Sequence, residues 1–299
     1  MNLSLSKIGE FGLIHRIKRL IRTDNSVVQG IGDDCAVIKF NQREYLLLTC
    51  DMLVEGVDFR SQEDPYLIGR KSLAVSMSDI ASCGGMPRYA LISLGIPKNK
   101  KIKFIDGLYK GIRDLAKVYS LNIIGGDISR SEKLVIDVSL IGLVEKNNLV
   151  LRSGAKLKDI IMVSAALGGS IKGRHLRFSP RIKEARFLVN SFKLNSMIDI
   201  SDGLTLDLSH VLEESDKGAV IYQDLIPLSR DCSGLEDALT SGEDFELLFT
   251  LSIKEARRLL SVNDSFFPIG HITGKKEGLV LIDRLGNPRK IKVKGYTHF

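Results

Sequence analysis

Hydrophobic residues recur with two different periods through the first half of the chain. Phe11, Ile14 and Ile17 follow the spacing of one helix face, whereas Ile136 and Val138 alternate with polar neighbours as in a half-buried strand. An Asp-Pro pair at residues 64–65 indicates a helix start. The pattern predicts helices at residues 11–21, 64–83 and 104–119, and strands at 45–49, 90–96, 121–124 and 134–140.

The second half repeats this style after a break at residues 146–151, where Lys-Asn-Asn separates two apolar stretches. We therefore predict two domains, at residues 1–147 and 148–299. Beyond the break the pattern predicts strands at 159–164, 197–200, 219–222 and 245–251, helices from residue 179 and over 203–214, and a strand-rich tail. The fold class expected is α/β with mixed sheets, and two domains suit a chain of 299 residues.

The charge balance is basic, with 43 Lys and Arg against 36 Asp and Glu and a net charge of +7. The basic residues are scattered and Trp is absent, so the composition favours a solvated basic surface over a nucleic-acid interface. Such a surface helps to attract anionic nucleotides.

Cysteine usage and hydropathy bear on location. The four cysteines show no CxxC spacing, which is typical of reduced thiols. The first residues lack a basic segment followed by an apolar stretch, and no apolar run approaches the roughly 20 residues that span a bilayer. We therefore expect a cytoplasmic protein without membrane contact.

Acidic residues beside glycine form the most informative pattern. They end apolar runs in Gly32-Asp33-Asp34, Thr49-Cys50-Asp51, Gly126-Asp127, Asp199–Gly203 and Gly242-Glu243-Asp244, and Asp79 adds another inside the helix predicted after residue 64. A single Asp-Gly pair is usually a turn. Five such places at predicted strand ends indicate a shared site, because the loops at strand ends in α/β proteins converge on ligands.

Carboxylates gathered in one cleft repel each other unless cations neutralise them. Proteins hold Mg²⁺ with a few carboxylates together with substrate phosphates, so the pattern indicates phosphoryl chemistry on a nucleotide. The chain contains no GxxxxGK[ST], no strand-linked GxGxxG and no HRD loop. The sequence thus predicts a nucleotide site dominated by metal ions.

Several segments resemble the thiamine-monophosphate kinase family. They are residues 30–36 (GIGDDCA), 51–56 (DMLVEG), 76–81 (SMSDIA), 124–127 (IGGD), 152–156 (RSGAK), 198–204 (IDISDGL), 241–246 (SGEDFE) and 294–299 (KGYTHF). The family belongs to the PurM-like superfamily, with aminoimidazole-ribonucleotide synthetase, selenophosphate synthetase and HypE. The resemblance implies a two-domain PurM-like architecture, a homodimer that pairs amino-terminal domains, and ATP- and Mg²⁺-dependent phosphorylation of thiamine monophosphate.

The same resemblance implies roles for individual residues. The implied Mg²⁺ ligands are Asp34, Thr49, Cys50, Asp51, Asp79, Asp127, Asp199 and Asp202. The implied nucleotide contacts are Tyr109, Gly126, Asp127, Arg152 and Ser201, and Glu243 resembles a contact to the cationic thiamine portion. Asp58 stands where the family usually has His, and Val293 where many members have an aromatic residue, so both positions bear on substrate recognition.

No catalytic base is expected. The acceptor phosphate, with a second pKa of about 6, is mostly dianionic near neutral pH and can attack the γ-phosphate directly. Catalysis would then rest on positioning and on charge neutralisation by metal ions. Two alternatives stay open: another ATP-using enzyme of the same superfamily, and a non-catalytic Mg-nucleotide sensor that keeps the carboxylates but not the substrate contacts.

Overall fold

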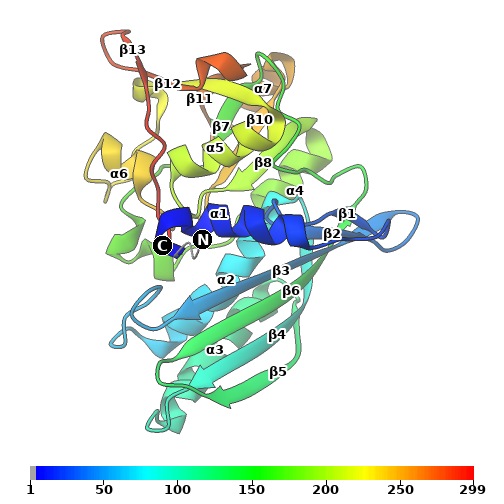
Figure 1. The fold of residues 1–299 in the computed structure, drawn as a ribbon, viewed down its shortest axis with the longest axis vertical. Coiled ribbons are helices and arrows are strands. Elements are labelled where there is room, and N and C mark those ends of the chain that lie inside the picture. The colour runs from blue at the N-terminus through cyan, green and yellow to red at the C-terminus, as the bar shows by residue number, and fades with distance from the viewer. Residues whose placement is uncertain (1–4) are drawn as a thin grey trace.

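The computed structural model describes residues 5–299, which form two β-sheets, one in each half of the chain (Figure 1). After helix α1 (Leu5–Leu20), six strands build the first sheet in the order β1-β2-β3-β6-β4-β5. Strands β4 and β5 run parallel, and the other neighbours run antiparallel. The strands are β1 (Val27–Gln29), β2 (Ala36–Lys39), β3 (Glu44–Val54), β4 (Met86–Ile96), β5 (Asn122–Arg130) and β6 (Val135–Glu145).

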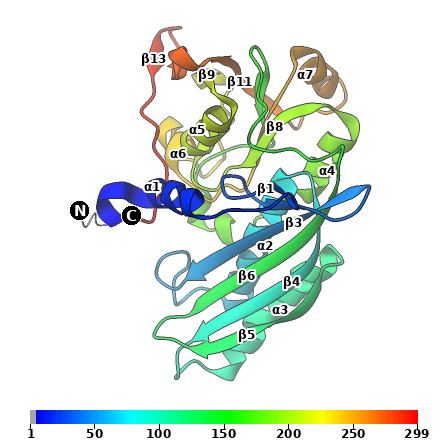
Figure 2. The same cartoon turned by 45° about the vertical axis from the view of Figure 1, so that its right-hand side comes forward.

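Two helices, α2 (Pro65–Ser82) and α3 (Ile102–Val118), cover one face of this sheet. The side chain of Asp64 caps α2 by accepting a hydrogen bond from a backbone N–H of the first turn at 2.9 Å. Gly69 lets the two helices approach closely, because a Cβ there would lie 2.0 Å from the Leu108 carbonyl oxygen. The other face of the sheet carries no helix in Figure 2.

The second sheet has seven strands in the order β13-β12-β9-β11-β7-β10-β8, with β9 and β12 parallel. Its strands are β7 (Ile160–Val163), β8 (Leu194–Asp199), β9 (Lys217–Tyr222), β10 (Leu247–Leu251), β11 (Phe267–Gly274), β12 (Leu279–Ile282) and β13 (Pro288–Lys290). Its helices are α4 (Ile182–Ser191), α5 (Leu204–Ser215), α6 (Leu235–Thr240) and α7 (Ile253–Leu260), with short 3₁₀ turns at Ser170–Lys172, Arg174–Leu176, Gln223–Leu225 and Lys275–Glu277. No helix between residues 5 and 299 has the length and apolar character needed to cross a membrane.

Alternation of side chains along the second sheet divides its buried residues between two cores. Met162 and Phe249 pack with α4 and α7 in a cluster that continues into the core of the first sheet. Ile161 and Leu248 belong to a second cluster with α5 and α6. One apolar core therefore joins the two halves, and α2 contacts both α4 and β8 at their junction.

The mixed α/β class is confirmed, as are most of the predicted elements. The prediction that Asp51 and Asp127 lie at strand ends is wrong, because β3 continues through Asp51 along its pairing with β6, and β5 continues through Asp127 along β4. The tail also contains α7, a helix with one apolar face that was not predicted. The domain boundary between residues 147 and 148 stays a prediction; the last strand of the first sheet ends at residue 145, and the second sheet begins at residue 160.

Candidate active site

Aspartates from distant parts of the chain meet beside α2. Asp34 precedes β2, Asp79 lies near the end of α2 and Asp199 is the last residue of β8, and one carboxylate oxygen from each lies within 4.8 Å of the others. Asp51, on β3, interacts electrostatically with Asp34 and Asp199. The fold thus brings together four of the carboxylates selected from the sequence, and we call this group the aspartate cluster.

Burial raises the proton affinity of three members of the aspartate cluster. Loss of hydration, together with repulsion from neighbouring carboxylates, raises the pKa of Asp51 to about 6 and that of Asp199 to about 8, and it raises the pKa of Asp79 well above its ordinary value. Within residues 5–299, the buried atoms Asp34 Oδ2 and Asp51 Oδ2 have no hydrogen-bond partner. Acceptor oxygens left unpaired in a buried acidic group fit a divalent cation.

Hydroxyl groups of the first half hold two members of the aspartate cluster. Ser78 Oγ donates a hydrogen bond to Asp199 Oδ2 at 2.6 Å, and Thr49 Oγ1 donates to Asp79 Oδ2. The neighbouring thiol of Cys50 points to the opposite face of β3, because successive residues of a strand alternate. There Cys50 Sγ donates to Asp137 Oδ2 at 3.1 Å. Thr49 therefore joins the aspartate cluster, and the side chain of Cys50 does not.

Arg152 places a positive charge beside the aspartate cluster. Its Nε donates a hydrogen bond to Asp34 Oδ1 at 2.9 Å, and its backbone N–H donates to Asp33 Oδ2 at 3.0 Å. Burial lowers the pKa of Arg152, but attraction to Asp34 and Asp33 outweighs it and raises the pKa overall. A guanidinium held in this way suits a phosphate group.

A cavity of about 1070 Å³ opens between the two halves of the chain. This volume lies just above the range of about 300–1,000 Å³ that is typical of small-ligand sites. Asp51 of the aspartate cluster forms part of its wall, as do Ser201 and Asp202 from the other half. Burial, with a further contribution from Glu10, raises the pKa of Asp202 to about 6. The cavity therefore connects the aspartate cluster to residues selected as nucleotide and metal contacts.

Glu243 stands on the wall of the same cavity, in a strained loop that precedes β10. Glu243 and Phe245 have φ angles of 64° and 52°, which residues with a Cβ rarely adopt. The backbone N–H of Glu243 donates to the Ser201 carbonyl at 2.6 Å, and Ser170 Oγ donates to the Glu243 carbonyl at 2.6 Å. On the side chain, the Lys71 ammonium of α2 donates to Glu243 Oε1. Contacts from both halves therefore hold Glu243 at the wall.

Two selected residues, Asp127 and Tyr109, lie apart from the aspartate cluster. Asp127 is exposed on the edge strand β5 and pairs with Ser93 of β4, which pairs with Asp137 of β6. Paired residues face the same side of a sheet, so Asp127 lies on the open face with Asp137 and Cys50. Tyr109 lies on α3 and packs against the core of the first half.

Gly126, also selected as a nucleotide contact, occupies a position that excludes other residues. Its φ is 153°, and a Cβ there would lie 1.8 Å from the Ile92 carbonyl oxygen. Strand β5 can approach β4 at this point only because the residue is glycine.

The residues selected for substrate recognition have different surroundings. Asp58 lines the cavity, but its Oδ2 accepts a hydrogen bond from the Val54 backbone N–H at 2.7 Å and closes the turn after β3. Val293 does not belong to the cavity wall, whereas Tyr296 does. The Tyr296 backbone N–H donates to the Asp202 carbonyl at 3.0 Å, so the carboxyl-terminal segment is fastened at the cavity.

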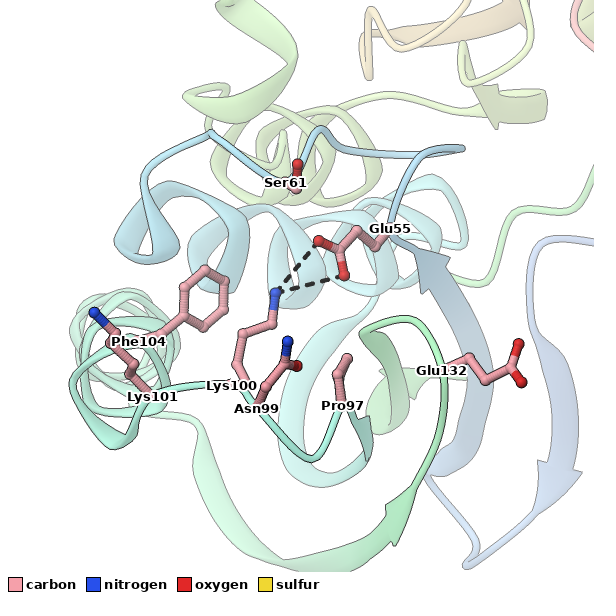
Figure 3. Close-up of a pocket in the computed structure, with 8 residues that line it drawn as sticks. All are labelled: Glu55, Ser61, Pro97, Asn99, Lys100, Lys101, Phe104 and Glu132. Carbon is pink, nitrogen blue, oxygen red and sulfur yellow. Dashed lines mark hydrogen bonds and ion pairs between the residues drawn. The ribbon is translucent and has the colours of Figure 1, made fainter.

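A second cavity, of about 460 Å³, lies in the first half near the start of α3 (Figure 3). Its Lys100 ammonium lies between the Glu55 carboxylate, with an N–O distance of 3.3 Å, and the Phe104 ring, whose centroid is 4.5 Å away. Lys100 is therefore already neutralised by Glu55.

Sequence reasoning overlooked Lys71, Asp137 and Asp207. Lys71 is almost fully buried, and Asp207 accepts hydrogen bonds from the backbone N–H groups of Asp202 and Gly203 at 3.0 Å. Lys71 could have been found, because it is a charged residue in the apolar stripe of its helix. Asp137 alternates with buried Ile136 and Val138, as a polar residue of any half-buried strand does, so its sequence context is ordinary.

The comparisons with known proteins agree with this geometry. The model of the AIR synthase related protein, N-terminal domain, matches residues 32–144. The thiamine-monophosphate kinase of Bacillus subtilis is 34% identical, with 97% of this chain and 99% of the relative covered, and that of Escherichia coli K12 is 35% identical, with 97% and 98% covered. A solved structure, AaThiL complexed with AMPPCP and TMP, has a TM-score of 0.89 and 32% identity, with both chains covered completely.

Fold and site together define a protein of the AIR synthase-related, PurM-like class, and more distant structures such as the HypE-HypF complex (TM-score 0.75, 17% identity, 94% and 99% covered) share this fold. Within this class, the thiamine-monophosphate kinases are the relatives that match the chain in sequence over nearly its whole length. The chain belongs to the thiamine-monophosphate kinase family.

Proposed function

We propose that this protein transfers the γ-phosphoryl group of ATP to thiamine monophosphate and forms thiamine diphosphate. The observation that carries the proposal is one cavity whose wall contains both a member of the aspartate cluster, Asp51, and the acidic residue Glu243. The relatives named thiamine-monophosphate kinase match the chain over nearly its whole length, and the AaThiL structure contains AMPPCP, an ATP analogue, together with TMP.

We propose that the aspartate cluster, with Thr49 and Asp202, holds Mg²⁺. The unpaired atoms Asp34 Oδ2 and Asp51 Oδ2 fit this role, as does the 4.8 Å grouping of three carboxylates. When bound, Mg²⁺ neutralises charge on the phosphates. The main chain of Cys50 is proposed to add a ligand beside Thr49. Asp127 lies apart from this group on the open face of the first sheet, so it is proposed to hold a separate Mg²⁺ ion.

The remaining proposed contacts are those to ATP and to the acceptor. Arg152 and Ser201 are proposed to contact the ATP phosphates, with Gly126 and Tyr109 nearer the nucleoside. At the acceptor end, the Glu243 carboxylate is proposed to meet the positively charged thiamine ring system. Tyr296, which lines the cavity, is proposed to supply the aromatic surface that the sequence suggested for Val293.

The residues of this chain position the reactants and do not move a proton at the reacting atom. The acceptor phosphate brings its own nucleophilic oxygen. His175, a histidine of the cavity wall, is buried and its Nδ1 lies 3.0 Å from the Ser170 carbonyl oxygen, so it serves to fasten the loop. Alignment for in-line attack is therefore the main contribution of the chain.

We also propose a homodimer formed through the open face of the first sheet. This face exposes Met52 and Leu91 by 60% and 41%. Burying these side chains against a second copy would remove apolar surface from water. Pairing would also cover Asp127 and Asp137, two residues of the same face. A cytoplasmic location is proposed because all four cysteines are free thiols.

Turnover of the purified protein tests the function. Thiamine, thiamine monophosphate and aminoimidazole ribonucleotide are offered in turn with Mg-ATP, and formation of ADP and of the phosphorylated product is measured. We expect turnover with thiamine monophosphate and a thermal shift with the same compound. Normal Mg-ATP binding without turnover of any acceptor would favour the nucleotide sensor, and turnover of another acceptor alone would favour a different enzyme of the superfamily.

A further inference from the structure

One face of α2 carries two side chains that reach across to the second half of the chain. Lys71 and Ser78 are seven residues apart, so they project from the same side of the helix, about 10 Å apart along its axis. Ser78 donates a hydrogen bond to Asp199 of the aspartate cluster at 2.6 Å, and Lys71 donates to Glu243. The same rigid helix therefore sets the positions of a carboxylate in the metal group and a carboxylate in the substrate loop.

Lys71 is held tightly in this position. Its side chain is 1% exposed, and its ammonium donates both to Glu243 Oε1 and to the Asp58 carbonyl oxygen, the latter at 2.7 Å. A buried ammonium needs such partners because it has lost its water. Within residues 5–299, Glu243 Oε2 takes part in no hydrogen bond, and the Glu243 side chain keeps 29% exposure on the cavity wall.

The other two acidic residues of the same loop are arranged differently. Asp244 is 0% exposed and pairs with Arg174 at 2.5 Å, and Glu246 is 3% exposed and pairs with Arg181. Both arginines belong to the second half, and both carboxylates are closed off from the cavity by burial. Glu243 differs because its cation comes from the first half and its carboxylate remains accessible.

We propose that Lys71 is the positioning residue for the acceptor, an inference that rests on the proposed function. By binding Oε1, Lys71 keeps Oε2 of Glu243 turned to the cavity, where a cationic ring of the substrate meets it. A carboxylate oriented before binding needs no ordering when the substrate arrives, and this favours affinity. Lys71 acts through Glu243 and makes no contact with the substrate itself.

Binding measurements on four variants test this role. Lys71→Met removes the ammonium at nearly constant length and should weaken binding of thiamine monophosphate about tenfold or more, with the Kd for AMPPCP within about twofold of wild type. Arg70→Met is the matched control, because Arg70 also reaches from α2 to the second half, through Phe178 and Ser179, but does not line the cavity. It should leave the Kd for thiamine monophosphate unchanged.

The other two variants show whether Lys71 acts through Glu243. Glu243→Gln should weaken acceptor binding, and Lys71→Met in that background should weaken it no further. A double variant that binds much more weakly than Glu243→Gln would mean that Lys71 touches the substrate and would overturn the proposal. Three other results would also overturn the proposal, because each indicates a purely structural lysine. They are an equal rise in Kd for AMPPCP and for thiamine monophosphate, the same rise in Kd for thiamine monophosphate in Arg70→Met, and failure of both Lys71 variants to fold.

Wild-type binding separates this inference from the function on which it rests. Wild-type protein that does not bind thiamine monophosphate refutes both. Wild-type protein that binds and phosphorylates it, beside a Lys71→Met variant of equal affinity, refutes the role of Lys71 alone.

Discussion

Replacing the ionisable carboxyl of Asp199 with a neutral amide should stabilise the protein when no divalent cation is present. Asp199 is 3% exposed, and its burial beside Asp34 raises its pKa to about 8. The folded chain therefore keeps a proton that the unfolded chain releases, so stability falls as pH rises from 3.8 to about 8. An asparagine at this position is neutral in both states and escapes this loss.

The size of the effect follows from the same pKa values. The value of pH 7 is 3.2 units above the ordinary pKa of 3.8 that the carboxyl has in the unfolded chain. At about 1.4 kcal/mol per unit, the free energy of unfolding is lower by about 4 kcal/mol. This is an upper figure, because the other members of the aspartate cluster share the repulsion. The Oδ1 of an asparagine can still accept the hydrogen bond from Ser78. Asp199→Asn should thus gain up to about 4 kcal/mol at pH 7 and almost nothing at pH 4.

Thermal unfolding between pH 4 and pH 8, in EDTA and in excess Mg²⁺, measures this difference. In EDTA the variant should unfold at a higher temperature than wild type, and the gap should widen as pH rises. In Mg²⁺ the order should reverse, because wild type gains binding energy that the variant lacks. Asp159→Asn is the matched control: Asp159 is also 3% exposed, but its Oδ2 accepts hydrogen bonds from Lys156 and Asn195 at 2.8 Å. Asp159→Asn should lower the unfolding temperature both in EDTA and in Mg²⁺. If Asp199→Asn also lowered it in both conditions, the reasoning would be refuted.

Three further predictions concern the substrates, the dimer and stability in acid. Asp127→Asn should reduce turnover by about 100-fold or more with an unchanged Tm, because the side chain is exposed; near-normal turnover would remove it from the metal site. Leu91→Arg, on the open face, should shift a dimer toward monomer in analytical ultracentrifugation, and an unchanged sedimentation coefficient would place the interface elsewhere. The two hydrogen bonds from Arg186 lower the pKa of Glu145 to about 2, so the stability this pair adds is complete above pH 4.5 and disappears as pH falls toward 2. Because Glu145 is half exposed, Glu145→Gln should cost about 1 kcal/mol or less in urea unfolding at pH 7 and nothing at pH 2, and an equal loss at both values would contradict the assignment.

Helices and strands could be predicted from the sequence where neighbouring residues alone determine them. The start of α2 was visible because Asp64 and Pro65 satisfy the first turn without help from the rest of the fold. The length of β3 and β5 was not, because their extension depends on hydrogen bonds to β6 and β4. Helix α7 was missed although its sequence does mark it. Ser252 caps the first turn by accepting a hydrogen bond from the Glu255 backbone N–H at 3.3 Å, and the buried residues Ala256 and Leu259 lie on one face.

The sequence by itself determined which residues are acidic, that they recur beside glycine, and that their order matches one family. Only the tertiary structure decided which of them meet. Asp34, Asp51, Asp79 and Asp199 converge because α2 lies between the two sheets, whereas Asp127 faces the open side through strand register. Lys71 acquired its partner Glu243 in the same way, across 172 positions of the chain. Contacts of this kind depend on how two halves pack, and the local patterns of a sequence do not encode that packing directly.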